Sequence, residues 1–453
     1  EKNSKIKRYI KMKSVNPHNL EVINTFQEMN QDEIKGIIQK SHHRFEQWKK
    51  STHTERSKLL NQLADQLEKE KEKLSELMHN EMGKLKSEGV GEIEKCAWVC
   101  RYYAENAKTF LADKTIKTDA SKSFIRYSPK GVHLAIMPWN FPFWQVFRFL
   151  TPCIASGNTA LLKHASNVSG CALAIEELFK SINAPADIFR TLLVSGKNME
   201  SVLESELIQG VSLTGSTPAG LKVIQQTSKK LISTVLELGG SDPYIVFEDA
   251  DLDDAVENIV QGRFLNCGQS CIAAKRLLVQ ETIYDSFIEK LTSQTKQKEL
   301  GPMASKDFRD DIHQQVIQSI QEGAKLVIGG EITNEESAYY PATILKDVTP
   351  EHTAFKEEMF GPVAVVSKFK NSDEAIILAN LSEFGLGSAI FTKNEECIEY
   401  FINELQAGSV FVNHFVKSDP RLPFGGEKLS GIGRELSEEG IREFVNIKTV
   451  SIK

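Results

Sequence analysis

Two cysteines lie four residues apart in the stretch FLNCGQSC, which runs from Phe264 to Cys271. This spacing suits metal ligands, a disulfide, buried apolar residues or one reactive thiol. A zinc site would need two or three more Cys or His ligands at recognisable spacing, and the nearby sequence contains none. Gly268–Cys271 followed by Ile272–Lys275 is typical of a loop that enters a helix, a position that lowers the pKa of a thiol. The pattern therefore favours Cys271 over Cys267 as a nucleophile, and no metal is expected.

A carboxylate that could act as a general base lies in LELGG, residues 236–240. Glu237 stands there between two leucines. Burial among apolar side chains raises the pKa of a carboxyl group toward the range that general-base catalysis needs. The alternative is a glutamate at a strand end that is hydrogen-bonded to the backbone.

An amide donor could come from PWNFP, residues 138–142. The prolines on either side of Asn140 fix the backbone directly after a strand, where open α/β sheets present their ligand crevices. The Asn140 side chain could then donate to an oxyanion that develops during a reaction. A rigid turn with aromatic packing is the alternative explanation.

Two further segments suit a cofactor that carries phosphate. LTGSTPAG, residues 213–220, is typical of a strand, a turn and a helix that begins near Pro218, so backbone N–H groups and the helix dipole would face an anion. A dinucleotide pyrophosphate would fit there, although the sequence is not GxGxxG. Lys163, at the end of another predicted strand, could reach ribose hydroxyls or a 2′-phosphate. A capped turn and an ordinary surface lysine are the alternatives.

The elements that must position these residues follow from hydrophobic periodicity. Apolar residues recur at helical spacing through the first part of the chain, where Gly83 is a candidate helix end. From about residue 131, short apolar runs alternate with helical segments, and strands are predicted at 132–137, 159–163, 191–194, 210–213 and 234–238. This alternation predicts parallel sheets with crossover helices, hence an α/β fold. A second series extends from Pro243 to about Gly408, so two α/β domains should divide near Gly239–Gly240.

Two segments fit neither series. Ser121–Pro129 alternates like a strand with one face in solvent, and the tail after Ser430 ends in the strand-like IKTVSIK. Strands that leave their own domains often pair with another chain, so these segments predict an oligomer.

Composition argues against several classes of function. The chain has 453 residues and a net charge of −6, which does not favour nucleic acid, because a clustered basic face would be needed. The basic run Lys5–Lys13 is interpreted as a solvated arm. No stretch approaches the roughly 20 apolar residues that span a bilayer, so no membrane is expected. Seven scattered cysteines are typical of a reducing compartment, and the expected location is cytoplasmic.

Taken together, these segments resemble the aldehyde dehydrogenase superfamily over nearly the whole chain. Seven matching stretches occur in the family's order: PWNFP (138–142), LLKHAS (161–166), LTGSTPAG (213–220), LELGG (236–240), NCGQSC (266–271), EEMFGP (357–362) and PFGGEKLSGIGRE (423–435). They are most similar to the short, KHA-containing branch of bacterial succinate-semialdehyde dehydrogenases. The Gly-Asp-Pro loop of relatives is missing before Gly301, either as a deletion or because residues are absent from the sequence.

The resemblance implies an aldehyde dehydrogenase-like fold of two parallel-sheet α/β domains with a β oligomerisation arm. It assigns residues 1–110 and 130–237 to a dinucleotide-binding domain and residues 238–428 to a catalytic domain. Residues 111–129 and 429–453 would form the arm, which implies a homodimer or homotetramer.

The resemblance also implies NAD(P)-dependent oxidation of a small aldehyde, most closely succinate semialdehyde, to its acid. Cys271 would attack the aldehyde to give a thiohemiacetal, and the Asn140 amide with the Cys271 backbone N–H would hold its oxyanion. Hydride transfer to the nicotinamide would leave a thioester, and Glu237 would activate water to release the acid. The alternatives are another small aldehyde, such as glutarate semialdehyde or an aliphatic or aromatic aldehyde, and a catalytically silent binding relative.

The cofactor contacts implied by the resemblance come from several motifs. Lys163 would bind the adenosine ribose, the Gly215–Ser216 turn the pyrophosphate, Glu358 the nicotinamide-side ribose and Phe360 the nicotinamide. The other residues expected around the cofactor are Ile136, Trp139, Ser166, Thr214 and Leu238. Ser166 stands where strongly NAD-preferring members often carry Glu, which would repel a 2′-phosphate. The chain should therefore accept NADP as well as NAD.

The substrate contacts are fewer. Arg148 lies eight residues after Asn140, matching an arginine that binds the substrate carboxylate in relatives that act on succinate semialdehyde. Some of these relatives have a second arginine six residues before the nucleophile, where this chain has Leu265. Cys267 is interpreted as a neutral space-filler. The alternative is a redox partner that forms a reversible disulfide with Cys271, which requires their Cα atoms to lie within about 7 Å.

Overall fold

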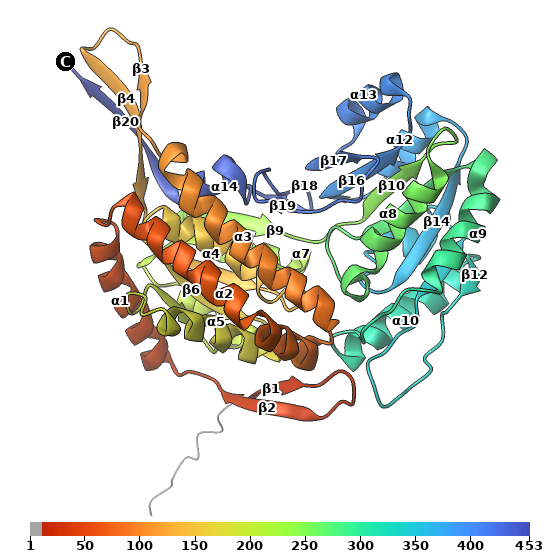
Figure 1. The fold of residues 1–453 in the computed structure, drawn as a ribbon, viewed down its shortest axis with the longest axis horizontal. Helices are drawn as coiled ribbons and strands as arrows, with labels where there is room; N and C mark the ends of the chain where they lie inside the picture. The colour runs from red at the N-terminus through yellow and green to blue at the C-terminus, as the bar shows by residue number, and fades with distance from the viewer. Residues whose placement is uncertain (1–10) are drawn as a thin grey trace, which may run out of the picture.

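The computed structural model describes residues 11–453. Two α/β lobes lie side by side, and a three-stranded arm projects from the first lobe (Figure 1). A hairpin of β1 (Lys11–Val15) and β2 (Val22–Gln27) lies at the opposite end of that lobe from the arm (Figure 1). Most of the basic run Lys5–Lys13 lies outside the described residues. Within 11–453, no helix combines the length and apolar character needed to cross a membrane.

The helical start of the chain consists of α1 (Gln31–Trp48), α2 (His53–Met82) and α3 (Lys86–Phe110). Asn30 and Thr52 begin the first two helices with capping boxes, in which side-chain and backbone hydrogen bonds satisfy the first free N–H groups. Gly83 ends α2 at a φ of 81°, a left-handed conformation that glycine adopts without strain. The predicted helix end at Gly83 is confirmed.

The first sheet has the order β19-β9-β8-β5-β6-β7, and all its neighbours are parallel except β19 and β9. Its strands are β5 (Val132–Met137), β6 (Thr159–His164), β7 (Phe189–Thr191), β8 (Ile208–Thr214), β9 (Ser233–Glu237) and β19 (Gly431–Ile432). Helices α4 (Trp144–Ala155), α5 (Ser169–Ser181), α6 (Glu200–Leu203) and α7 (Thr217–Thr227) connect them. The strand predicted at 191–194 is wrong by a few residues. The Leu193 carbonyl accepts a hydrogen bond from Met29, so the chain leaves the sheet there.

The second sheet has the order β12-β13-β14-β11-β10-β16-β17, with only β12 antiparallel to its neighbour. Its strands are β10 (Asp242–Val246), β11 (Ala274–Gln280), β12 (Lys325–Ile328), β13 (Thr343–Lys346), β14 (Val363–Phe369), β16 (Gly387–Phe391) and β17 (Ser409–Val412). The main helices around it are α8 (Leu252–Phe264), α9 (Tyr284–Thr295), α10 (Lys306–Gln321), α12 (Ser372–Asn380) and α13 (Glu395–Glu404). The α/β expectation is confirmed for both lobes.

The chain changes sheets between β9, which ends at Glu237, and β10, which begins at Asp242. The predicted division near Gly239–Gly240 falls in this interval. The exact domain limits remain a prediction, and the tail contributes to more than one part: β19 pairs with β9, with Gly431 opposite Glu237.

The arm is a three-stranded sheet in the order β20-β4-β3, formed by β3 (Lys114–Ile116), β4 (Lys122–Pro129) and β20 (Val445–Ile452). Both strands predicted from alternation, at 121–129 and in the tail, are confirmed, and they pair antiparallel along their full length. The arm leaves Ile447 and Ile452 about half exposed, at 58% and 47%. Apolar side chains on so thin a sheet have no core to cover them.

Candidate active site

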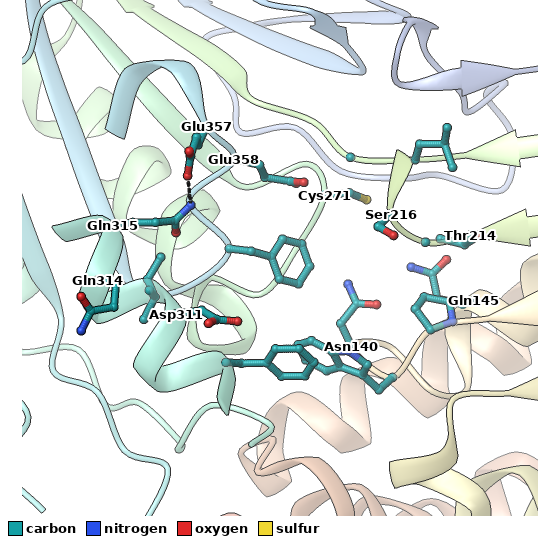
Figure 2. Close-up of a pocket in the computed structure, with 18 residues that line it drawn as sticks. Asn140, Gln145, Thr214, Ser216, Cys271, Asp311, Gln314, Gln315, Glu357 and Glu358 are labelled. Carbon is teal, nitrogen blue, oxygen red and sulfur yellow. Dashed lines mark hydrogen bonds between the residues drawn. The ribbon is translucent and has the colours of Figure 1, made fainter. Parts of the chain in front are cut away.

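Two cavities meet at Cys271. The first, of about 580 Å³, is lined by the PWNFP loop, the turn after β8, the segment after β9 and part of α10. The second, of about 400 Å³, lies between α3, α4 and the loop after β17. Cys271 and Gln145 line both. Figure 2 shows the first cavity, with Cys271, Ser216 and Thr214 facing Asp311 and Gln315 across it.

Cys271 lies in a turn, and the predicted helix after it is wrong. Strand β11 begins at Ala274 and is buried along nearly its whole length between its neighbours β10 and β14, so the sheet outweighs the helical preference of Ile272–Lys275. The segment after Cys271 therefore provides no helix dipole to lower the pKa of the thiol. Burial raises the Cys271 pKa to about 12, while Lys275 and Arg148 oppose this rise.

Three left-handed residues shape the loop before Cys271. Asn266, Cys267 and Gly268 have φ values of 54°, 56° and 70°. For the two residues that carry a Cβ, such a conformation costs about 1–2 kcal/mol each. Buried Arg263 braces the loop, donating from its guanidinium to the carbonyls of Gly268 and Met359 at 2.9 and 3.2 Å. One guanidinium nitrogen of Arg263 thus bonds backbone carbonyls of this loop and of the Met359 segment.

Cys267 packs away from the cavities. Its side chain is 4% exposed and belongs to the core of the second lobe, with Met303 and Ile312. Cys271 packs instead against the core of the first lobe. This placement supports the space-filling interpretation of Cys267, while the disulfide stays a prediction. Among residues 11–453 no group of His, Cys, Asp or Glu side chains is arranged as a metal site.

Asn140 reaches the same loop from the end of β5. The side-chain N–H of Asn140 donates to the Gln269 backbone carbonyl at 3.0 Å. The backbone carbonyl of Asn140 accepts from the Asn266 side-chain amide at 2.7 Å. Lys84 also donates to that carbonyl at 3.0 Å. The amide therefore lies beside the Cys271 turn, where donation to an oxyanion on the substrate would replace the bond to Gln269.

A buried ion pair holds the PWNFP loop in place through hydrogen bonds to its backbone and to the start of α4. Lys84 and Glu92 contact each other, and their side chains are 1% and 2% exposed. Glu92 also accepts from the backbone N–H groups of Phe143 and Trp144 at 2.8 and 2.9 Å, at the start of α4. Neither residue of the pair was singled out from the sequence, because the loop they hold lies about fifty residues further along the chain.

Glu237 lies at the end of β9, fully enclosed. Its side chain is 2% exposed, and neither carboxylate oxygen has a hydrogen-bond partner within residues 11–453. Burial raises the Glu237 pKa well above its usual range, and the nearby carboxylate of Glu435 raises it further. A side chain at Gly425 would begin 2.9 Å from a Glu237 oxygen, so the glycine provides the room that this carboxylate occupies.

Arg148 lies near Glu237, and its positive charge opposes the rise in the Glu237 pKa. Its guanidinium forms a buried ion pair with Glu435, contacts Thr214 Oγ1 at 3.3 Å and lies 4.6 Å from the Phe424 ring centre. Arg148 lines the second cavity, as a substrate contact would, but its charge is already paired. Glu435 was not predicted as part of this group.

Most residues predicted to bind the cofactor line the first cavity. These are Trp139, Thr214, Gly215, Ser216, Leu238, Glu358 and Phe360, together with the predicted catalytic residues Asn140 and Cys271. Ile136, Lys163 and Ser166 are not part of its lining, although all three lie at or just after the carboxyl ends of β5, which pairs with β8, and β6, the next strand in the sheet. Burial lowers the Lys163 pKa.

The geometry of the first cavity fits a dinucleotide. The turn at Gly215–Ser216 leads into α7, an eleven-residue helix with Pro218 in its first turn, so free N–H groups face the cavity. A side chain at Gly239 would begin 2.5 Å from a Glu358 oxygen, so only glycine leaves that wall open. Glu358 is held by Lys275 at 2.9 Å, and Lys275 also donates to the Cys271 carbonyl at 2.7 Å.

The far wall of this cavity was missed by sequence reasoning. Trp139 stacks on Phe308 with ring centres 4.7 Å apart and meets Phe360 edge-on at 5.9 Å. Phe308 begins a run on α10 that also includes Asp311, Gln314 and Gln315. These residues form no recognisable sequence motif. They line the cavity only because α10 lies across its opening.

Comparisons with known proteins agree with this geometry. A family model described as "Aldehyde dehydrogenase family" matches residues 5–450. A Synechocystis sp. protein named "Probable succinate-semialdehyde dehydrogenase", NADP(+) type, is 45% identical over 449 residues, covering 97% of this chain and 99% of the relative. The NADP(+) succinate-semialdehyde dehydrogenase of Mycobacterium leprae is 44% identical over 452 residues, with coverages of 97% and 99%.

Solved structures lead to the same family. The crystal structure of succinic semialdehyde dehydrogenase from Streptococcus pyogenes in complex with NADP+ superimposes with a TM-score of 0.95 at 35% identity, covering 97% of this chain and 99% of that one. The predicted aldehyde dehydrogenase-like fold is thereby confirmed. This chain belongs to the aldehyde dehydrogenase family.

Proposed function

We propose that this chain oxidises succinate semialdehyde to succinate with NADP, and also with NAD, as the hydride acceptor. The observation that carries the proposal is the position of Cys271 at the junction of two cavities. One is lined by a helix N-terminus and an apolar slot suited to a dinucleotide, and the other by cationic and aromatic side chains suited to a short carboxylated aldehyde. The names of the relatives at 44–45% identity support the same substrate.

Cys271 and Asn140 line the first cavity and Glu237 is enclosed outside both cavity linings, and together these residues suit each step of such a reaction. Cys271 would lose its S–H proton to water as Sγ forms a bond to the aldehyde carbon, and the Asn140 amide would donate to the oxygen that becomes negative. A bound nicotinamide would supply the hydride acceptor, so that a thioester remains on Cys271. Glu237 would then take a proton from the water that attacks this thioester, which releases succinate and restores the thiol.

The test of the substrate compares succinate semialdehyde with butanal, which has the same carbon chain but no carboxylate. The wild type should show a much higher kcat/KM for succinate semialdehyde, because a buried cation binds a carboxylate strongly. The variant Arg148→Ala should raise KM for succinate semialdehyde by about 10-fold or more and KM for butanal far less. Equal efficiency of the wild type on both aldehydes would rule out the proposed substrate.

Cofactor choice is proposed to depend on Ser166, which lies just after β6 near Lys163. The variant Ser166→Glu should shift the ratio of kcat/KM values from NADP toward NAD by about 10-fold or more, because its carboxylate would repel the 2′-phosphate. Steady-state assays with each cofactor at saturating aldehyde measure this ratio. Ser166→Ala, which adds no charge, serves as the control, and an unchanged ratio in Ser166→Glu would contradict the assignment.

We further propose that the arm of β3, β4 and β20 joins copies of the chain into a homodimer or homotetramer. Its exposed isoleucines and the free edge of β20 support this. A cytoplasmic location is proposed because all seven cysteines are unpaired.

A further inference from the structure

The second cavity contains a cation whose charge no carboxylate pairs. Lys95, on α3, lines this cavity together with Cys271 and Arg148. Its ammonium group donates to Ser418 Oγ at 2.8 Å and lies 4.4 Å from the ring centre of Trp144. Both contacts accept a cation without cancelling its charge. Lys95 forms no ion pair with any residue of the described chain, although it is partly buried.

The acidic groups around Lys95 are already engaged elsewhere. Glu92 pairs with Lys84, and Asp419 pairs with Arg421 at 2.7 Å. Glu88, which also lines the cavity, accepts a hydrogen bond from the Asn266 backbone N–H at 3.2 Å. Burial, with a smaller contribution from the positive charge of Arg148, lowers the pKa of Lys95 to about 8. Lys95 is thus still cationic near pH 7, and an anion that entered the cavity would stabilise that charge.

Ser418 adds a hydrogen-bond donor at the same point. Its oxygen accepts from Lys95 and also from the Trp144 indole N–H at 3.1 Å. A hydroxyl whose oxygen accepts two hydrogen bonds keeps its own hydrogen for a third partner. A carboxylate placed here would receive one hydrogen bond from the charged Lys95 ammonium and one from the neutral Ser418 hydroxyl.

Other cations of the cavity are less suited to this role. Lys84 is buried in its ion pair with Glu92, and Arg148 in its ion pair with Glu435. Lys417 also lines the cavity, but it is exposed to solvent, and water screens its charge. Leu265, where some relatives have a second arginine, contributes only an apolar wall.

We propose that Lys95 binds the distal carboxylate of the aldehyde substrate and so determines specificity for a semialdehyde acid. This inference rests on the proposed function. It places a substrate contact on α3, where none was predicted from the sequence. Arg148 would then contribute a charge already shared with Glu435, whereas the full charge of Lys95 is available to the substrate.

The experiment measures kcat and KM for succinate semialdehyde and for butanal in the wild type and three variants. Lys95→Met keeps the length of the side chain and removes its charge, so KM for succinate semialdehyde should rise by about 10- to 100-fold, the loss expected for a charged hydrogen bond. Kinetic constants for butanal should change by less than about threefold. Lys95→Arg should retain most of the preference. Lys108→Met, at an exposed position of α3 outside both cavity linings, is the control and should leave the preference unchanged.

A second measurement uses succinate as an unreactive competitor of butanal. Its inhibition constant should rise in Lys95→Met by a factor similar to that seen for KM, which a general structural effect on turnover would not produce. If Lys95→Met does not fold, Lys95→Gln provides the same comparison. Equal losses on both aldehydes, or no loss on either, would overturn the role of Lys95.

The outcomes separate this inference from the proposed function. A wild type that prefers succinate semialdehyde, together with a Lys95→Met variant that keeps the same preference, would overturn only the assignment of Lys95. A wild type without that preference would overturn the substrate and this inference together.

Discussion

Replacing Cys271 by alanine should lower kcat for aldehyde oxidation by about 10⁴-fold or more, because no other group at the junction of the two cavities can form the covalent intermediate. Production of reduced cofactor, followed by its absorbance with either NADP or NAD, measures the effect. Dinucleotide binding should persist, since the Gly215–Ser216 turn and α7 are unchanged, and a titration of the variant with NADP checks this.

The matched control for Cys271→Ala is Cys267→Ala. Cys267 is packed in the core of the second lobe, so its truncation should lower stability by about 1 kcal/mol while kcat stays within about threefold of the wild type. An equal loss of activity in both variants would contradict the assignment of Cys271 as the nucleophile. Neither variant can form a disulfide between positions 267 and 271, since each keeps only one of the two thiols.

Local sequence predicted the parts of the site that depend on short segments. The strands that end at Met137, Thr214 and Glu237 have clear apolar runs, and the turns after them carry Asn140 and the Gly215–Ser216 pair. In a parallel sheet, loops that follow strands meet at one edge, so the order of the motifs was enough to bring these residues together.

The parts that sequence reasoning missed depend on distant pairing. Ile272–Lys275 was interpreted as helical from its local composition, but β11 lies inside the second sheet and its burial decides the conformation. Glu435 comes close to Glu237 only because β19 folds back beside β9. Lys95 was not singled out from the sequence, because only the packing of α3 against α4 and the loop of Ser418 places it in a cavity.

The burial of Glu237 beside Glu435 has a direct consequence for hydrolysis of the thioester, the second half of the reaction. Glu237 and Glu435 are 2% and 3% exposed, and Arg148 forms its ion pair with Glu435. Burial and the neighbouring carboxylate of Glu435 raise the pKa of Glu237, and the charges of Arg148 and Arg434 only partly oppose this rise. A carboxylate with a raised pKa is a stronger base once ionised, although a smaller fraction is ionised near neutral pH.

The variant Glu237→Gln should therefore lose thioester hydrolysis while it keeps the earlier steps. Steady-state kcat should fall by about 10²- to 10⁴-fold, the usual contribution of a general base. Mixing the variant with NADP and succinate semialdehyde should still give a rapid burst of reduced cofactor, close to one equivalent per active site, because Cys271 and Asn140 are intact. Stopped-flow absorbance measures the burst, and mass spectrometry of the quenched protein should find the succinyl group on Cys271.

The pH dependence gives an independent check on the same residue. An acid whose pKa is raised becomes a base only as the pH increases through that value, so kcat of the wild type should rise with pH until Glu237 is ionised. Glutamine does not titrate, and the slow turnover of Glu237→Gln should lack this rise apart from the contribution of hydroxide. Glu237→Asp, which keeps a carboxylate on a shorter side chain, should retain the pH dependence at a reduced rate. A variant Glu237→Gln with full steady-state turnover, or without any burst, would show that the base lies elsewhere.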